Sequence, residues 1–328
     1  MQAMVLEKVG EPLILKEIPI PSPQPHEVLI KVHACGVCRT DVHIVDGELP
    51  SPQLPLILGH QIVGDIYCLG TKVKKHKVGE RAGVPWLGKS CHVCQYCQSD
   101  RENLCDEAIY TGYQQNGGYA QFCTAHEDFI LKLSHDYDDL HTAPLLCAGL
   151  IGYRALKLIG NAQHIGFYGF GSSAHILIQV AKEQGRKIYV FTRPGDHQTQ
   201  SFACHLGADW AGGSEQLPPE SLDAAIIFAP LGALYIKALQ AIKKGGKVIS
   251  AGIHMSDIPS FPYALLWGER SISSVANLTR QDGIDFIDAI KSIKLQIAIK
   301  TYLLEDANQA LTDIRNGNVC GSAVLKIE

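Results

Sequence analysis

The sequence lacks the features that carry a chain into or across a membrane. Its longest apolar run without charge, residues 224–236, spans 13 positions and contains Pro230 and Gly232. A membrane-spanning helix needs roughly 18 or more consecutive apolar residues. The amino-terminal residues MQAMVLEKVGEP also lack the basic segment and apolar segment of a secretory signal. We therefore expect a cytoplasmic protein with no membrane partner.

Charged residues are few, and neither sign is in large excess. The chain has 29 Lys and Arg residues and 33 Asp and Glu residues, which gives a formal net charge of -4. A nucleic-acid-binding protein usually carries a basic excess for the phosphate backbone, so nucleic acid is excluded as an expected partner. Hydrophobic residues make up 46% of the chain, which excludes extended disorder. At roughly 150 residues per domain, 328 residues predict two domains.

Cysteine is abundant for a cytoplasmic chain, with 11 residues in total. In a reducing compartment, closely spaced cysteines indicate a metal site before they indicate disulfides. Two paired disulfides are the alternative interpretation. Four of the cysteines crowd into a single short segment, with the spacing C-x2-C-x2-C-x7-C: Cys91, Cys94, Cys97 and Cys105.

The hydrophobic pattern changes near residue 140. Before it, short segments such as residues 27–34 alternate apolar and polar positions, which predicts a mostly antiparallel β domain. Helical spacing over residues 142–158 is followed by alternating strands and helices, which predict a doubly wound parallel sheet. After residue 277 we expect one helix (283–293) and a closing strand (323–327) that return to the first domain. The predicted strands of the parallel sheet are 165–168, 188–191, 208–211, 225–228, 247–250 and 272–275, and its helices are 175–184, 198–206 and 234–242.

A glycine motif lies between the first predicted strand of that sheet and the helix that follows. Residues 169–174 read G-F-G-S-S-A, where Gly169 permits a tight turn, Gly171 lets pyrophosphate approach the backbone, and Ala174 permits close helix packing. An ordinary glycine turn is the alternative, but the strand-helix-strand context favours a dinucleotide site.

The end of the second predicted strand indicates which dinucleotide binds. An NAD site places Asp or Glu there, on the ribose 2′-hydroxyl, whereas this chain reads Phe191-Thr192-Arg193. A hydroxyl and a guanidinium are suited to a 2′-phosphate, so we expect NADP(H), with NAD(H) as the alternative. In that alternative Arg193 is a solvated loop charge, and the nearby Asp196 complicates the assignment.

Three further segments combine thiols and imidazoles: CGVCRTDVH at 35–43, GHQ at 59–61 and LCAG at 146–149. Cysteine and histidine are the ligands that zinc prefers, and a catalytic zinc keeps one coordination position open. With these motifs in this order, the chain resembles the zinc-dependent alcohol dehydrogenases of the medium-chain dehydrogenase/reductase family over essentially its whole length. The resemblance implies an α/β fold with a GroES-like catalytic domain (1–146 and 278–328) and a Rossmann cofactor domain (147–277).

The resemblance also implies two zinc ions per chain. The catalytic ion would be held by Cys38, His60 and Cys147. A structural ion with a closed coordination shell would be held by Cys91, Cys94, Cys97 and Cys105.

Four residues of the segment after Cys38 receive roles from the same resemblance. Thr40 and His43 match a proton relay that ends in an imidazole at the protein surface. Asp41 would accept the second ring N–H of the ligand His60. Arg39 would contact the cofactor pyrophosphate.

The implied activity is hydride transfer between a nicotinamide cofactor and a primary alcohol or aldehyde. Trp86 matches an aromatic wall of the substrate pocket, which argues against a polyol or threonine dehydrogenase. A non-catalytic zinc- and nicotinamide-binding redox sensor is a further alternative. Gln61 stands where many relatives have Glu, and our hypothesis is that it leaves the zinc more electrophilic. Analogy with the family predicts a homo-oligomer, either a dimer or a tetramer.

Overall fold

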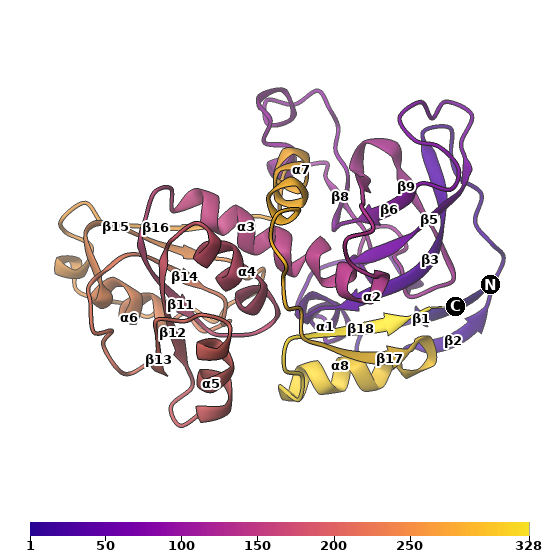
Figure 1. The fold of residues 1–328 in the computed structure, drawn as a ribbon. Coiled ribbons are helices and arrows are strands. Elements are labelled where there is room, and N and C mark those ends of the chain that lie inside the picture. Colours follow the sequence, from indigo (N-terminus) through magenta and orange to yellow (C-terminus); the bar gives the residue numbers. More distant parts are fainter. Residues whose placement is uncertain (328) are drawn as a thin grey trace. The chain divides into compact units, whose positions relative to one another are not determined.

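The computed structural model describes residues 1–327 and divides into two compact units (Figure 1). The first unit contains Met1–Cys147, Asn277–Asp288 and the chain from Ala298 onward. The second contains Ala148–Ala276 and Ala289–Ile297. Both units are therefore built from segments that are far apart in the sequence.

The first unit is organised around a seven-stranded sheet in the order β10-β6-β5-β3-β18-β17, with β9 also paired to β3. All its pairings are antiparallel except that of β17 with β18. This confirms the mostly antiparallel, GroES-like architecture. The strands are β3 (Glu27–Val37), β5 (Ile62–Leu69), β6 (Arg81–Val84), β9 (Phe122–His126), β10 (Leu131–Lys132), β17 (Ile299–Leu303) and β18 (Ser322–Lys326).

Two smaller sheets complete the strands of this unit. β1 lies between β2 and β4 in one of them, and β7 pairs with β8 in the other. Buried aliphatic side chains of β1, β3 and β5 contribute to a single core cluster. The strands are β1 (Gln2–Leu6), β2 (Ile14–Glu17), β4 (Leu56–Ile57), β7 (Leu87–Lys89) and β8 (Ile109–Tyr110).

The carboxyl-terminal segment contains more elements than its pattern predicts. The predicted helix is α7 (Arg280–Ile290), and the closing strand is β18. Between them the structure adds β17 and α8 (Ala307–Asn316), which the sequence analysis missed. Helix α8 ends at Asn316 and is followed by Gly317, whose φ of 74° is left-handed and suits glycine. In Figure 1 the yellow strands β17 and β18 extend the sheet beyond β3, which agrees with the pairing of β18 to β3.

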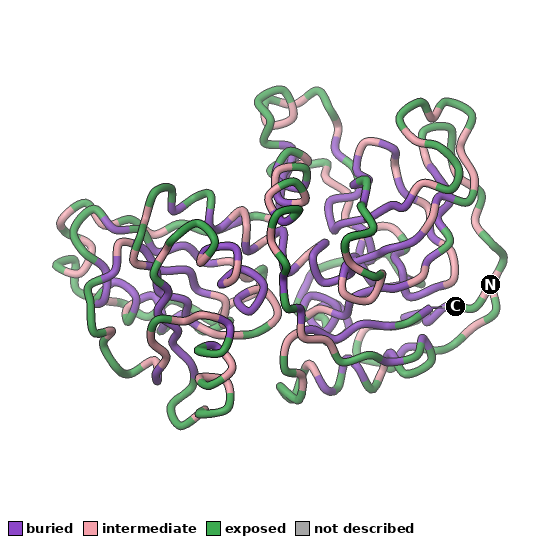
Figure 2. The backbone as a smooth tube through the Cα atoms, viewed as in Figure 1, coloured by how far each residue is buried: buried purple, intermediate pink, exposed green. Residues whose placement is uncertain are grey.

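The second unit contains a six-stranded parallel sheet in the order β13-β12-β11-β14-β15-β16. The order reverses direction between β11 and β14, where doubly wound sheets bind their ligands. All six predicted strands are present, and the third lies two residues later than predicted. Burial is greatest in the central strands β11, β12 and β14, whereas the edge strand β16 is mostly exposed; Figure 2 colours the backbone by burial. The six strands are β11 (His164–Tyr168), β12 (Lys187–Thr192), β13 (Trp210–Gly213), β14 (Leu222–Ile227), β15 (Ile242–Ser250) and β16 (Ser271–Ser274).

Helices connect these strands as expected. They contact the strands beside them, α4 with β12, α5 with β12 and β13, and α6 with β14 and β15. The helices are α3 (Ala148–Leu158), α4 (Ser172–Glu183), α5 (His197–His205) and α6 (Leu234–Ala241).

The predicted helix over residues 142–158 is broken in the structure. Helix α2 (Asp139–Thr142) is followed by a 3-10 turn (Ala143–Leu146), and α3 starts only at Ala148. Pro144 lies in the turn and has no N–H to continue an α-helix. Cys147 falls at the break, with φ −136° and ψ −66°. Because Cys147 lies outside helical geometry, its side chain does not take the direction that a continuous helix would give it.

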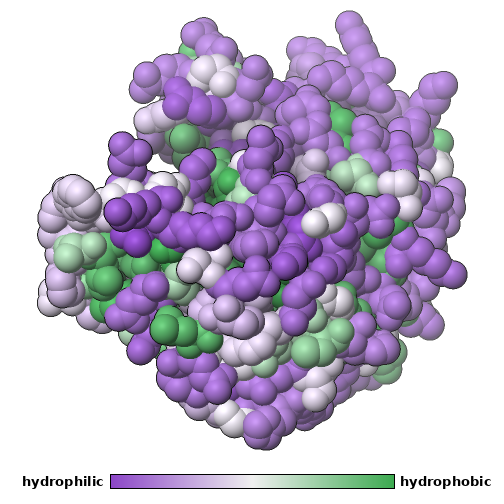
Figure 3. All heavy atoms as spheres, turned by 60° about the vertical axis from the view of Figure 1, so that its left-hand side comes forward, coloured by the Kyte–Doolittle hydropathy of each residue, from purple (hydrophilic) through white to green (hydrophobic). Residues whose placement is uncertain are grey.

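Polar side chains predominate on the face drawn in Figure 3, and apolar side chains gather there in separate patches. Within residues 1–327, no helix has the length and apolar character needed to span a bilayer.

Candidate active site and metal centres

Three predicted ligands meet in the first unit. Cys38 follows β3 and precedes α1 (Arg39–Val45), His60 follows β4, and Cys147 lies at the break before α3. Their ligand atoms all lie within 4.8 Å of one another. The sulfur atoms of Cys38 and Cys147 are 3.9 Å apart. Two thiolates bound at 2.3 Å to a tetrahedral zinc would be about 3.8 Å apart, so the geometry fits a zinc ion.

The buried imidazole of His60 supports the same conclusion. His60 is fully buried, and its Nε2 atom has no hydrogen-bond partner among the described residues. Burying a polar atom without a partner costs free energy, which a bound metal would offset. Burial lowers the pKa of His60, but Asp41 and the Cys38 thiol raise it more, to about 10. The negative groups around His60 therefore stabilise a cation at this point, either a proton on the ring or a metal ion bound to a neutral ring.

Of the two thiols, Cys38 is prepared for the same cation, whereas the hydrogen bond with Cys38 and burial raise the pKa of Cys147. The hydrogen bond with Cys147 lowers the pKa of Cys38, and the neighbouring His60 lowers it further against the opposing effect of burial. A thiolate is the form of cysteine that binds metals. The site can therefore offer a thiolate to zinc without reorganising.

Asp41 lies behind His60, as the sequence analysis expects. Its Oδ1 is 3.3 Å from Nδ1 of His60, and both side chains are fully buried. The Oδ2 atom accepts the backbone N–H of Cys38 at 2.8 Å. One oxygen of the Asp41 carboxylate thus binds the backbone of Cys38, and the other faces the ring of His60.

The proposed relay residues lie on one helix. Thr40 and His43 are three positions apart in α1, and residues at this spacing are neighbours on a helix face. The Oγ1 atom of Thr40 is 3.6 Å from the sulfur of Cys38. His43 is not at the surface as predicted, because it is only 7% exposed and its Nδ1 contacts the carboxylate of Glu48.

Trp86 lies beside the catalytic cluster. Its ring centroid is 5.5 Å from that of His60, and on another side it contacts Tyr110 at 5.0 Å. Trp86 is buried beside His60, and its expected role as a wall of the substrate pocket stays a prediction. Gln61 is also buried, and its side chain lies over the Cα of Gly36, where an added Cβ would be 2.5 Å from Oε1. The proposed electronic effect of Gln61 stays a prediction.

The four clustered cysteines form a second group. Their sulfur atoms lie within 4.8 Å of one another, and those of Cys91 and Cys97 are 3.9 Å apart. The amides of Val93 and Cys94 lower the pKa of Cys91 to about 7. Four convergent thiols fit a structural zinc with a closed coordination shell.

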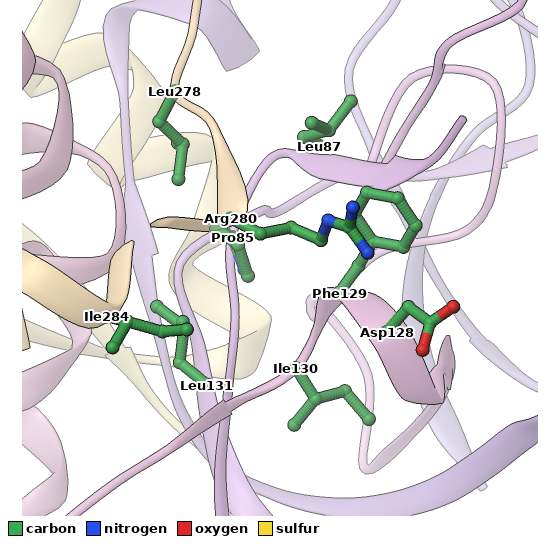
Figure 4. Close-up of a pocket in the computed structure, with 9 residues that line it drawn as sticks. All are labelled: Pro85, Leu87, Asp128, Phe129, Ile130, Leu131, Leu278, Arg280 and Ile284. Carbon is green, nitrogen blue, oxygen red and sulfur yellow. The ribbon is translucent and has the colours of Figure 1, made fainter. Parts of the chain in front are cut away.

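Glu102 anchors the segment that carries these cysteines, a contact the sequence analysis missed. Its Oε1 accepts hydrogen bonds from the backbone N–H of Arg280 at 2.8 Å and from Arg280 Nε at 3.1 Å. The guanidinium also lies over the ring of Phe129 (Figure 4), 5.4 Å from its centroid. Phe129 and Arg280 border a pocket of about 50 Å³ that Leu87 and Ile284 also line. It is much too small for a dinucleotide.

The glycine motif of the second unit has the geometry of a phosphate site. Gly169 has a φ of 93°, and an added Cβ would lie 3.0 Å from Ala229. An added Cβ on Gly171 would meet no atom within 4 Å, so this backbone faces open space. Among the described residues, no side chain caps the amino terminus of α4 at Gly171. Ala174 is fully buried. These features suit the approach of a pyrophosphate.

Thr192 and Arg193, at the end of β12, differ in how accessible their side chains are to a cofactor phosphate. Thr192 is buried, and its hydroxyl accepts the side-chain N–H of Gln200 at 3.0 Å. The expected contact of Thr192 with a cofactor phosphate is therefore not supported. Arg193 is exposed, and no ion pair or hydrogen bond of its side chain is found within residues 1–327. Asp196 does not pair with it, because its Oδ1 accepts the Thr199 N–H at the start of α5.

Arg39 has a partner in the first unit. Its guanidinium donates to the carbonyl oxygen of Ile314 in α8 at 2.8 Å. The expected contact with the pyrophosphate stays a prediction.

Comparisons with known proteins agree with this geometry. Residues 24–135 match the alcohol dehydrogenase GroES-like domain family. The probable alcohol dehydrogenase AdhA of Mycobacterium tuberculosis is 43% identical, over 94% of this chain and 91% of its own. The fold is similar to that of a Helicobacter pylori CAD complexed with NADP(H), with a TM-score of 0.89 at 22% identity and coverage of 99% and 97%.

A second solved structure binds the other cofactor. Acetophenone reductase from Geotrichum candidum, in complex with NAD, has a TM-score of 0.88 at 26% identity. The similarity covers 99% of this chain and 96% of that one. Similar folds therefore bind NAD in one case and NADP(H) in the other.

Proposed function

Because the chain belongs to the zinc-containing medium-chain alcohol dehydrogenase family and is an NAD(P)-dependent enzyme, we propose that it transfers hydride between NADP(H) and a primary alcohol or its aldehyde. In this proposal the first unit (Met1–Cys147, Asn277–Asp288 and the chain from Ala298 onward) is the catalytic domain, and the second unit (Ala148–Ala276 and Ala289–Ile297) binds the cofactor. The observation that carries the choice of NADP(H) is the unpaired guanidinium of Arg193.

Charge at the end of β12 supports this choice. A carboxylate at this point would hydrogen-bond the ribose hydroxyl of NAD and repel the phosphate of NADP. The chain has Arg193 there, and Asp196 is engaged in capping α5. An exposed guanidinium binds phosphate through short, charge-assisted hydrogen bonds. Thr192 is left out of this phosphate site because its hydroxyl is buried against Gln200.

The mechanism assigns distinct tasks to the residues of the first unit. Cys38, His60 and Cys147 would hold a catalytic zinc. When bound, zinc supplies a Lewis acid toward the substrate oxygen, and the nicotinamide supplies or accepts the hydride. Trp86 limits the pocket beside His60 with an apolar surface, which favours an unsubstituted alkyl or aryl chain over a polyol.

Alcohol oxidation also releases one proton, and aldehyde reduction takes one up. Thr40 lies next to Cys38, so its hydroxyl is placed to exchange this proton with the substrate oxygen. His43 follows on the same face of α1 and is the next acceptor. The carboxylate of Glu48 contacts Nδ1 of His43 and so holds the orientation of the ring. A redox sensor would need no such pair, and the chain is an enzyme.

The cofactor assignment is tested by initial rates of aldehyde reduction by the zinc-loaded enzyme with NADPH and NADH in parallel. We expect the wild type to prefer NADPH. Arg193→Gln should lower kcat/KM for NADPH about 10- to 100-fold, the effect of losing a hydrogen bond to a charged group. The rate with NADH should stay unchanged.

The matched control is Lys244→Gln, which removes a cation from an exposed position on β15 of the same unit. A wild type that prefers NADH would disprove the proposal. An equal loss of kcat/KM with both cofactors in Arg193→Gln would show that Arg193 does not recognise the 2′-phosphate.

A further inference from the structure

A buried tyrosine lies on the far side of Asp41 from His60. We propose that Tyr119 is a positioning residue: its hydroxyl fixes the Asp41 carboxylate, which in turn sets the ring orientation and tautomer of His60 for metal binding. The inference rests on the proposed role of His60 as a zinc ligand.

The contacts form a continuous chain. The Tyr119 hydroxyl donates to Oδ2 of Asp41 at 3.0 Å. The Cys38 backbone N–H donates to the same oxygen at 2.8 Å. Both hydrogen bonds therefore engage Oδ2, and Oδ1 is left facing Nδ1 of His60 at 3.3 Å. A carboxylate that accepts the Nδ1–H leaves Nε2 unprotonated and free to bind a metal.

The Asp41–His60 contact depends on small rotations. At 3.3 Å the two atoms are within ion-pair distance, but neither has a partner that meets hydrogen-bond geometry among the described residues. A modest turn of the carboxylate therefore decides whether the Nδ1–H is accepted. Tyr119 restricts that turn together with the Cys38 N–H, because both donate to the opposite oxygen.

The Tyr119 ring is itself fixed in place. The residue is fully buried, and its backbone N–H donates to the carbonyl of Leu58 at 2.9 Å, while its carbonyl accepts the N–H of Met4 at 2.8 Å. The ring packs directly on Gly59, where an added Cβ would lie 2.4 Å from Cδ1. Gly59 immediately precedes His60 and has a φ of 97°. Tyr119 thus touches the backbone before His60 as well as the carboxylate behind its ring.

The environment gives the carboxylate no substitute for this hydrogen bond. Asp41, His60 and Tyr119 are each 0% exposed. Without the Tyr119 hydroxyl, Oδ2 would keep only the Cys38 N–H and would not be rehydrated, so the carboxylate would be freer to turn. The consequence at His60 would be a weaker or wrongly oriented metal ligand.

The test compares Tyr119→Phe with Tyr113→Phe, each zinc-loaded. Tyr113 is also buried in the first unit, and its hydroxyl donates to the carbonyl of Pro50 and not to Asp41. The readout is the zinc dissociation constant of each site, measured by competition with a chromogenic chelator. The four-cysteine site serves as an internal reference. A cobalt-substituted sample reports the ligand field at His60 through its visible absorption spectrum.

We expect Tyr119→Phe to weaken zinc binding at the Cys38, His60 and Cys147 site about 10- to 100-fold. The four-cysteine site should keep its affinity, and Tyr113→Phe should change neither site. Asp41→Asn should cost less affinity in the Tyr119→Phe background than in the wild type, because the two residues act in series.

An unchanged dissociation constant and cobalt spectrum in Tyr119→Phe would overturn the inference, even if the variant melts at a lower temperature. Equal weakening in both tyrosine variants would overturn it too, since the effect would then be one of general stability. A wild type that binds zinc only at the four cysteines would overturn the proposed catalytic site as well. The cofactor preference plays no part in these measurements.

Discussion

The carboxylate of Glu127 lies 3.0 Å from Nδ1 of His26, a residue 101 positions earlier in the chain. Oε2 of the same carboxylate accepts the backbone N–H groups of Lys74 at 2.9 Å and Lys75 at 3.2 Å. Burial raises the pKa of Glu127, but the hydrogen bonds from His26 and the two amides outweigh it and hold the pKa at about 2.

This pKa predicts the acid sensitivity of the fold. A carboxyl whose pKa is lower in the folded state stabilises the protein above its unfolded pKa, near 4.3. That contribution is lost as the pH falls from about 5 toward 2. Urea unfolding at pH 7 and pH 3 should therefore show a smaller drop in unfolding free energy for Glu127→Gln than for the wild type. An identical drop in the two proteins would contradict the assignment.

The two glycines of the dinucleotide motif should respond differently to the same substitution. Gly169→Ala should lower the melting temperature, because φ is 93° and the new Cβ would press on Ala229 at 3.0 Å. Gly171→Ala should leave the melting temperature unchanged, since its Cβ would meet no atom within 4 Å. It should instead raise the KM for the cofactor several-fold. Calorimetry gives the melting temperatures, and initial rates give the KM for the cofactor. An unchanged melting temperature in Gly169→Ala would contradict the strain expected at this glycine.

Metal content should separate the two cysteine-containing sites. We expect about two zinc ions per wild-type chain by mass spectrometry of the metal, and one in either Cys147→Ser or Cys105→Ser. Cys147→Ser should lose turnover while its melting temperature changes little. Cys105→Ser should lower the melting temperature, because a closed metal site stabilises the folded segment. Loss of both ions from either variant would show that the sites are not independent.

The contact between Glu102 and Arg280 should stabilise the four-cysteine segment. Glu102→Gln weakens two hydrogen bonds made by a buried side chain, so we expect a loss of about 1–3 kcal/mol in unfolding free energy. Glu107→Gln changes an exposed carboxylate near the same segment and should have little effect. Zinc release from the four-cysteine site should be faster only in the first variant. Equal behaviour of the two variants would contradict this role.

The parallel sheet was predictable because its strands are short apolar runs between helices of regular spacing. The zinc ligands were predictable because Cys38, His60 and Cys147 lie in motifs of characteristic composition. Contacts between distant residues without a motif were not, and Glu102 with Arg280, separated by 178 positions, is one example. Tyr119 is another, because nothing near it in the sequence indicates Asp41.

Two other departures have local causes. The spacing of α1 gives no sign that Glu48 and the surrounding core bury His43. The sequence also gives no sign that Thr192 is buried with its hydroxyl on Gln200 of α5, so its expected contact with the cofactor stays a prediction. The sequence pattern shows which residues can do chemistry more readily than which way they face.

Strand β18 pairs with β3 at Val37 and Cys35, directly before the ligand Cys38, yet it begins only at Ser322. A ribosome synthesises Cys38, His60 and all four clustered cysteines long before this strand exists. During translation the end of β3 next to Cys38 lacks its partner strand, and the sheet around the candidate zinc site closes only after β18 has been synthesised. Deletion of the last seven residues should therefore damage the centre of the first unit and not its periphery.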